Sequence, residues 1–263
     1  MAYQFIYIVF FVIYFSAIIA EDWYSRKNNL GLYEKKDSFM NLGIGILVVI
    51  TRLLLDGFRI QFWFYLASFA LFEIGDQFYF WILLFIGNEL TYYWFHRFSH
   101  ENKFLWAVHV NHHSSTRLNL LTSARLPVFA IVVQALLWAP LVLLGFNPLM
   151  IFLISQIGFI FATFQHLRVF GKLGWAEKVF NTPTHHAIHH ASNKEYINHN
   201  YGLALIVFDK LFGTFVEEKE EVEIKYGITN NIETNNPLVV IFHEWINIFK
   251  DYKQKWTTSK DPN

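Results

Sequence analysis

The strongest constraint on the fold is a series of long apolar runs that contain few or no charged residues. Residues 2–20 carry no charge at all, and a helix of about 20 apolar residues can cross a hydrocarbon core about 30 Å thick. A cleaved signal peptide would also begin with an apolar run, but here no Lys or Arg precedes it and the run is longer than such peptides use. Comparable runs cover residues 39–55, 78–95, 126–144 and 148–164. The pattern predicts an all-α fold, a multi-span helical bundle in a membrane.

The composition agrees with a membrane protein and excludes several functional classes. Charged residues make up 16% of the chain, against about 25% in soluble domains, and aromatic residues reach 19%. The 21 Lys and Arg balance 21 Asp and Glu, so no basic excess is available for phosphates and no nucleic acid is expected as a partner. Cysteine is absent, which excludes disulfides, thiolate zinc sites, iron–sulfur clusters and cysteine nucleophiles.

The distribution of positive charge predicts the orientation. Arg26, Lys27, Lys35 and Lys36 lie between the first two runs, which makes that loop cytoplasmic by the positive-inside rule. Residues 62–74 form an apolar stretch too short to span, and we expect a re-entrant or interfacial segment there. If this stretch does not cross, then residues 96–113, residues 166–199 and the polar C-terminal region all lie on the cytoplasmic side.

An amphipathic helix is predicted near the C-terminus, over residues 237–256. Its apolar residues recur at steps of three and four, at Val239, Phe242, Ile246 and Phe249. Such a helix either lies on the bilayer surface or packs against the cytoplasmic part of the protein, and the sequence leaves both possibilities open.

Histidine is concentrated in three clusters. The chain has 12 His, and none lies in the first 95 residues. His96 and His100 are four residues apart and share one helix face. Two further clusters repeat one spacing, with His185 directly before the second: His109, His112, His113 and His186, His189, His190.

These clusters predict a histidine-rich site for two metal ions. Without a metal, several imidazoles packed together would place potential cations side by side, whereas a metal binds their neutral nitrogens. Imidazole suits zinc, copper, iron and nickel, so the spacing alone does not identify the metal. An all-nitrogen site beside a membrane, with no thiolate, favours oxygen chemistry at a di-iron centre. The Thr182-Pro183 pair predicts a helix start whose dipole helps to keep His185 and His186 neutral.

The order of these motifs and the residues within them resemble those of a known family. The pattern HxxxH, HxxHH and a distal HxxHH, starting at His96, His109 and His186, resembles the fatty acid hydroxylase and sterol desaturase superfamily of integral-membrane di-iron oxygenases. Within it, residues 92–97, 106–109 and 181–186 are most similar to the alkylglycerol monooxygenase branch. The similarity extends over about residues 89–242.

The resemblance implies a set of site residues. Glu89 stands where the family often carries Asp, and the implied role is to orient a ligand imidazole as a hydrogen-bond acceptor. His199 and His243 are expected to be structural, and Asn200, Tyr201 and Asp209 to serve packing and capping. The implied metal ligands are His96, His100, His109, His112, His113, His166, His185, His186, His189 and His190.

The resemblance also implies a reaction and its cofactors. Two iron ions and O2 as cosubstrate would hydroxylate or desaturate an unactivated C–H bond of a lipid such as an ether lipid, a fatty acyl chain or a sterol. Electrons would come from an external reductant or electron-transfer protein, with tetrahydrobiopterin as one candidate donor. Arg168 stands where the alkylglycerol enzymes carry an acidic residue, which counts against tetrahydrobiopterin and an ether lipid.

A single membrane-embedded domain is therefore expected over residues 1–263. It would comprise N-terminal spans with the re-entrant segment (1–77), a catalytic histidine region (78–215), and a polar cytoplasmic tail with the amphipathic helix (216–263). The alternative function is a membrane metal-binding or transport protein without oxygenase activity. Transport usually places ionisable residues at the bilayer midplane, and the predicted spans hold no histidine inside. A bis-histidine haem protein would leave the triplet clusters without a role.

Overall fold

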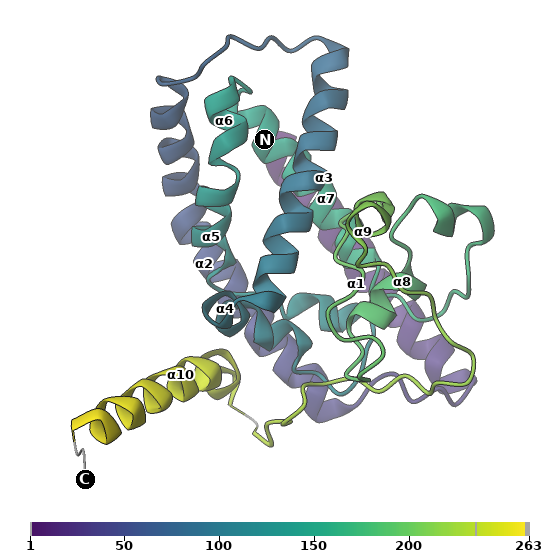
Figure 1. Cartoon of the computed structure of the whole chain (residues 1–263). Helices are drawn as coiled ribbons and strands as arrows, with labels where there is room; N and C mark the ends of the chain where they lie inside the picture. The colour runs from purple at the N-terminus through teal and green to yellow at the C-terminus, as the bar shows by residue number, and fades with distance from the viewer. Residues whose placement is uncertain (1, 235, 261–263) are drawn as a thin grey trace.

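The computed structural model describes residues 2–234 and 236–260, and this part of the chain is helical with no strand (Figure 1). The predicted all-α class is confirmed, while residues 1, 235 and 261–263 of the expected domain lie outside the described residues. Two 3-10 helices, η1 (Leu120–Ala124) and η2 (Gly174–Lys178), join the α-helices. The α-helices are α1 (Ala2–Lys27), α2 (Lys35–Ala67), α3 (Phe78–Glu101), α4 (Lys103–His113), α5 (Ala130–Leu137), α6 (Ala139–Leu144), α7 (Pro148–Phe164), α8 (Pro183–His189), α9 (Val207–Phe212) and α10 (Pro237–Lys260).

The long helices form a bundle whose lower end, in the view of Figure 1, carries the histidine segments. Helix α2 runs away from that end and α3 returns to it, and α5, α6 and α7 pack between them. The main core of the bundle is rich in aromatic and aliphatic side chains, among them Trp63, Leu84, Phe95, Trp138, Val142 and Ile151.

Helix α2 is longer than predicted and includes the first part of residues 62–74, whose expected re-entrant or interfacial placement stays a prediction. Residues 62–67 continue α2, and residues 68–77 form the connection to α3. Hydropathy underestimates this helix because it carries Arg52, Asp56 and Arg59 in its second half. An ion pair of 2.6 Å between Arg59 and Asp56, one turn apart, lets the helix continue.

The apolar run at residues 126–144 is not one helix. It begins as irregular chain and then forms α5 and α6, which meet at Trp138. Pro140 explains the break, because proline has no N–H to donate and its ring crowds the preceding turn. The run at residues 148–164 is a helix as predicted, and Asn147 caps it by accepting from the Leu149 N–H at 2.8 Å.

A tight turn at Gly145 joins α6 to α7. Gly145 has a φ of 114°, in the left-handed region. A Cβ at this position would also lie 2.1 Å from the carbonyl oxygen of Phe72, so only glycine fits against the α2–α3 connection.

By length and composition, α2 is the one helix among the described residues that could cross a membrane. At about 1.5 Å per residue its 33 residues extend about 50 Å. The combined α5–α6 segment and α7 are shorter apolar helices. Many large apolar side chains on the outside of the bundle are exposed, including Leu53, Leu54, Phe58, Phe78, Leu83 and Ile157.

Helix α10 packs against α4 and the start of α2, on the histidine side of the bundle. Val240, Ile241 and Ile248 form its buried face. The predicted apolar face is more exposed. Phe249 is 71% exposed, and Phe242 is 41% exposed and keeps a ring contact with Phe129 at 5.7 Å between centroids. The helix therefore has two apolar faces, of which one packs on the protein and the other is largely exposed within the described part of the chain.

The cationic α1–α2 loop lies on the histidine side. The Asn119 side chain, at the start of η1, donates to the Leu32 carbonyl at 2.7 Å, and the Tyr33 hydroxyl donates to Glu21 at 2.7 Å. Residues 117–125 in turn connect directly to the C-terminal end of α4, where His112 and His113 lie. The basic loop and the histidine segments thus share one end of the molecule.

Candidate metal centre

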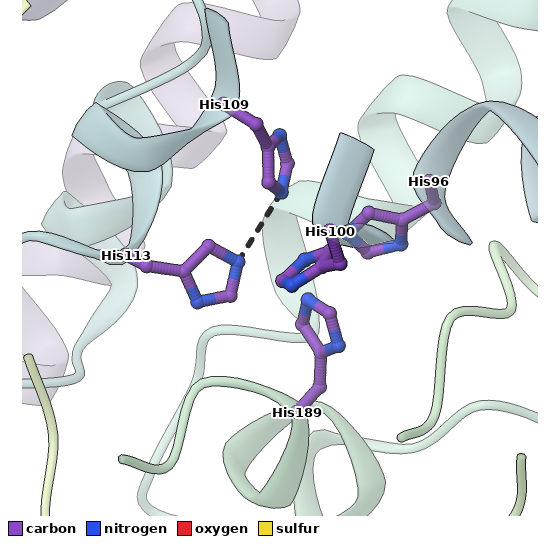
Figure 2. Close-up of side chains that lie close together, drawn as sticks. All are labelled: His96, His100, His109, His113 and His189. Carbon is purple, nitrogen blue, oxygen red and sulfur yellow. Dashed lines mark hydrogen bonds between the residues drawn. The ribbon is translucent and has the colours of Figure 1, made fainter. Parts of the chain in front are cut away.

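Nine of the ten predicted ligands gather into two histidine groups at the lower end of the bundle. Within each group, one ligand nitrogen from each histidine lies within 4.8 Å of those from all the others. Figure 2 shows the first group, whose rings point toward a common centre. The first histidine group is His96, His100, His109, His113 and His189, and the second is His112, His166, His186 and His190.

Helices α4 and α8 each supply both groups. On α4, His109 and His113 are four residues apart and share a face, so both belong to the first group, whereas His112 belongs to the second. On α8 the assignment is reversed, because the His186–His190 pair serves the second group and His189 the first. Each triplet therefore spans the boundary between the groups. The rings of His113 and His190 stack across that boundary at 4.4 Å between centroids.

Local sequence explains why the ligand helices begin where they do. Asn102 ends α3 and caps α4, accepting from the N–H groups of Phe104 and Leu105 at 3.0 and 3.2 Å. This turn brings α4 back beside α3, so that His100 and His109 lie 5.0 Å apart between ring centroids. Thr182 caps α8 and Pro183 is its first residue, as the sequence predicts.

Backbone carbonyls set the orientation of four ligand rings, two in each group. His96 Nδ1 lies 2.8 Å from the Tyr201 carbonyl, and His189 Nδ1 lies 2.9 Å from the His199 carbonyl. In the second group, the corresponding contacts are His166 with Ala162 at 3.0 Å and His112 with Arg125 at 3.2 Å. A carbonyl can only accept, so each Nδ1 carries the proton and each Nε2 keeps a free lone pair.

The remaining nitrogens fit metal ions. Imidazole nitrogens bind an ion such as zinc at about 2.0–2.1 Å, which places two nitrogens of one ion about 3.0–3.4 Å apart. The Nε2 atoms of His109 and His113 are 3.2 Å apart, and those of His186 and His190 are 3.1 Å apart. The buried Nε2 atoms of His96, His100 and His189 have no hydrogen-bond partner. The histidine groups therefore offer converging imidazole nitrogens with free lone pairs and no other partner in the described part of the chain. Transition metals bind ligands of this kind.

The electrostatics of the site keep these rings neutral. Burial, followed by the neighbouring imidazoles, holds the pKa of His113, His186 and His190 well below 6.5. Burial lowers the pKa of His166 to about 4. Neutral imidazole is the form that binds a metal, so the site is prepared for metal at neutral pH.

Three histidines lie outside both groups. His185, predicted as a ligand or its neighbour, forms a capping box with Thr182, and its Nδ1 lies 3.2 Å from the Phe180 carbonyl. Its place in the predicted ligand set is therefore not supported by the geometry. His199 and His243 contact nearby carbonyls, as expected for structural residues, and the His199 carbonyl also orients His189.

Glu89 does not contact a ligand imidazole within the described residues, contrary to the implied role. Its Oε2 atom accepts the N–H groups of Ala204 and Leu205 at 2.9 and 2.8 Å, and its Oε1 atom is buried without a partner. The same loop provides the Tyr201 carbonyl that orients His96. Glu89 therefore acts on the first histidine group through the loop.

Other side chains support the site, and the roles of Arg125, Asp37 and Asn41 were not predicted from the sequence. Buried Arg125 pairs with Asp37 at 2.5 Å and also contacts Asn41, while its carbonyl orients His112. Asp209 accepts the N–H groups of Tyr201 and Gly202 at 2.7 Å, which agrees with the expected capping role. Backbone carbonyls leave no signal in a sequence, so this layer of the site was not predictable.

A cavity extends from the histidine groups into the bundle. His109 and His112 form part of its wall, and most of the remaining lining is apolar. Arg52 and Arg59 of α2 line it together with Gln134 and Gln156. Its apolar lining includes Val48, Trp63, Phe95, Ile131, Trp138 and Phe159.

Comparisons with known proteins agree with the motifs. The sequence profile of the fatty acid hydroxylase family matches residues 81–214. Alkylglycerol monooxygenase of Homo sapiens is 34% identical over 225 residues, which cover 84% of this chain and 49% of that protein. Alkylglycerol monooxygenase of Danio rerio is also 34% identical, over 84% of this chain and 48% of the relative. The ornithine lipid hydroxylase OlsE of Rhizobium tropici is 34% identical over 55% of this chain and 44% of its own length.

The chain spans about half the length of the alkylglycerol monooxygenases that it matches. No solved structure matches. The family profile covers α3, α4, α7, α8 and α9, and so includes all nine histidines of the two groups. On this evidence the chain belongs to the fatty acid hydroxylase family.

Proposed function

We propose that this protein is a membrane lipid monooxygenase with a histidine-bound di-iron centre. The observation that carries the proposal is the pair of histidine groups beside a largely apolar cavity. The groups hold nine imidazoles, of which eight are buried and that of His100 is half-buried. Family membership and relatives named as lipid hydroxylase and alkylglycerol monooxygenase support this choice over a purely structural metal site.

The first histidine group would hold one iron and the second the other. When bound, two irons supply the redox chemistry that activates O2 for oxidation of an unactivated C–H bond. The chain itself orients the ligands through the carbonyls of Tyr201, His199, Ala162 and Arg125. Glu89 and Asp209 hold the loop that contains Tyr201, so they act as positioning residues.

The cavity would bind the lipid with its reacting carbon beside His109 and His112. Its aromatic and aliphatic lining excludes water and suits a hydrocarbon chain. The substrate class would be a lipid with an acyl or alkyl chain. The electron donor must approach from outside, as an external reductant or electron-transfer protein.

We further propose that the chain crosses the membrane several times as one domain, with the histidine groups on the cytoplasmic side. The exposed apolar side chains of α2, α3 and α7 and the apolar length of α2 support the membrane assignment. The basic α1–α2 loop shares the histidine end, which by the positive-inside rule is the cytoplasmic end. The exposed face of α10 would rest on the bilayer surface there.

The decisive experiment combines metal analysis with lipid analysis. The full chain is expressed in a membrane, purified in detergent and examined for metals by mass spectrometry, and lipid extracts of the cells are compared with those of cells expressing His113→Ala or His190→Ala. We expect two irons per chain, a lipid that gains one oxygen atom or loses two hydrogens, and loss of the oxidised lipid in both variants. His243→Ala, outside both groups, is the control and should behave as the unaltered protein.

Two results would contradict the proposal. Iron content that is unchanged in both His113→Ala and His190→Ala would remove the metal assignment. Metal-loaded protein that oxidises no lipid, but carries metal ions into vesicles, would establish the transport alternative instead.

A further inference from the structure

We propose that Arg52 forms a subsite for an anionic group of the lipid, a carboxylate or a phosphate, inside the cavity beside the histidine groups. The inference rests on the proposed function, since it specifies the class of lipid that the cavity accepts. It assigns a role to a charged residue that neither the metal groups nor the core of the bundle uses.

The charges lining the cavity are not balanced by the protein. Arg52, Asp56 and Arg59 lie in the second half of α2, and Asp56 pairs with Arg59 at 2.6 Å. Arg52 makes no ion pair with a carboxylate within the described residues. Its Nη1 atom lies 3.5 Å from Gln156 Oε1, and its guanidinium lies 5.0 Å from the centre of the Phe159 ring. Counting the three charged groups, one positive charge remains at Arg52.

An uncompensated cation at this position is unfavourable without a ligand. The surroundings are apolar, with Val48 and Phe159 in the same wall, and α2 is the helix most suited to cross a membrane. Charged residues inside membrane segments are costly and are found where they face a partner or a functional cavity. A carboxylate or phosphate would provide that partner, and the planar guanidinium can donate two parallel hydrogen bonds to either group.

Two acceptor groups of the cavity are already engaged, whereas Arg52 has no carboxylate partner within the described residues. Gln134 Oε1 accepts from Arg59 at 3.2 Å, and Asn88 Oδ1 accepts from the Trp138 indole at 2.9 Å. Arg52 is half-buried and lines the cavity, so a ligand in the cavity can reach it. The contact of Arg52 with Gln156 bridges these two helices and would exchange for the contact with an anion.

The position of Arg52 allows one lipid to reach both the subsite and the metal groups. Phe159, which Arg52 contacts, and Ala162 both line the cavity from α7 and lie one turn apart. Ala162 is also the residue whose carbonyl orients His166 of the second histidine group. An anion at Arg52 would thus be two helical turns from the metal groups, with the apolar wall available to the rest of the molecule.

The test measures binding, so that it is independent of catalysis. Purified full chain in a neutral detergent is titrated with dibromostearate, with a phosphatidate that carries dibrominated chains, and with the neutral counterparts dibromostearyl alcohol and dibrominated diacylglycerol. Bromine quenches tryptophan fluorescence at short range, and Trp63 and Trp138 line the cavity. The variants are Arg52→Gln, Arg52→Lys and Gln156→Glu, with Arg26→Gln, at an exposed ion pair on α1, as the matched control.

We expect at least one anionic lipid to bind about tenfold more tightly than its neutral counterpart, the size of one charge-assisted hydrogen bond. Arg52→Gln should abolish this preference, Arg52→Lys should retain part of it, and Arg26→Gln should leave it unchanged. Gln156→Glu should also abolish it, because the new carboxylate beside Arg52 occupies the subsite. This variant decides the matter if Arg52→Gln does not fold. The two anionic probes distinguish a carboxylate from a phosphate as the natural source.

The proposal is overturned if the protein binds neutral and anionic lipids equally, or if the preference survives in both Arg52→Gln and Gln156→Glu. The outcome is separate from the proposed function. A protein that oxidises lipids but shows no anionic preference loses only the subsite, whereas a preference without any oxidised lipid removes the monooxygenase and leaves an anionic-lipid site.

Discussion

The carboxylate of Glu89 holds the loop that orients His96, without contacting the imidazole. Glu89 Oε2 accepts two backbone N–H groups, from Ala204 and Leu205, and the Tyr201 carbonyl on the same loop lies 2.8 Å from His96 Nδ1. The acidic residue and the ligand lie on the same helix, α3, yet they communicate through a segment more than a hundred residues later in the chain. Glu89 therefore has a positioning role, because it contacts the loop and not the ligand itself.

Glu89→Gln should therefore be much milder than Glu89→Ala. The glutamine oxygen can still accept the two N–H groups, whereas alanine leaves both unsatisfied at about 1–3 kcal/mol each. We expect Glu89→Gln to keep the full metal content and Glu89→Ala to lower the metal content and the melting temperature, measured by mass spectrometry and by thermal unfolding. Loss of metal in both variants would show that the charge itself is needed at the centre.

Paired substitutions should reveal how α4 and α8 divide their histidines. His112→Ala with His190→Ala damages only the second histidine group, and we expect one of two ions to remain. His113→Ala with His190→Ala damages both groups, and we expect both ions to be lost. Metal content per chain in the two double variants gives the answer. Equal losses would mean that the triplets are not divided between two ions.

The metal-free protein should lose stability as the pH falls below 6.5. Histidines in the unfolded chain titrate near 6.5, while burial lowers the pKa of His166 to about 4 and holds that of His186 well below 6.5. The unfolded state therefore binds more protons in this window, so stability is complete above 6.5 and decreases toward pH 4, by about 1.4 kcal/mol per pH unit for each such group. The slope of the unfolding free energy against pH is measured by denaturant unfolding of chelator-treated protein. The measurements run from pH 7.5 to 5, a range that includes both sides of about 6.5. A slope of zero would contradict neutral, buried imidazoles.

Removing Arg125 should destabilise the protein far more than removing a surface arginine. Its ion pair with Asp37 is buried, and loss of one partner of a buried pair costs about 3–5 kcal/mol. Arg26→Gln breaks an exposed pair with Asp22 and should cost about 1 kcal/mol or less. Thermal unfolding of Arg125→Gln and Arg26→Gln compares the two. Because the Arg125 carbonyl orients His112, metal content should also fall in the first variant alone.

Filling the cavity should reduce turnover without removing the metal. Ala130 is buried on α5 and lines the cavity wall, so a phenylalanine there would occupy space meant for the lipid. Overpacking costs about 1–3 kcal/mol, which a folded protein of this size tolerates. We expect Ala130→Phe to keep two metal ions and to yield less oxidised lipid in cells. Unchanged oxidation would place the lipid elsewhere.

The local pattern of the sequence determined the elements that carry the site. Apolar runs predicted most helices, the Thr182-Pro183 pair predicted the start of α8, and the spacing of four predicted which histidines share a face. Those features depend on backbone geometry within a few residues, which is why they could be derived without a structure. The ends of the spans were less well predicted where a long-range contact compensates a local cost, as for Arg59 of α2, which donates to Gln134 of α5.

Only the tertiary structure decided how three clusters make two groups. His112 and His113 are neighbours in the chain and lie in different groups. Adjacent residues on a helix point about 100° apart, so the His113 ring lies near that of His100 on α3 and the His112 ring near that of His166, just beyond α7. His185 looks like a fourth ligand in the sequence, yet it turns to cap its helix. Glu89, Tyr201 and Arg125 act through backbone atoms of distant segments, and such contacts arise only when the helices pack.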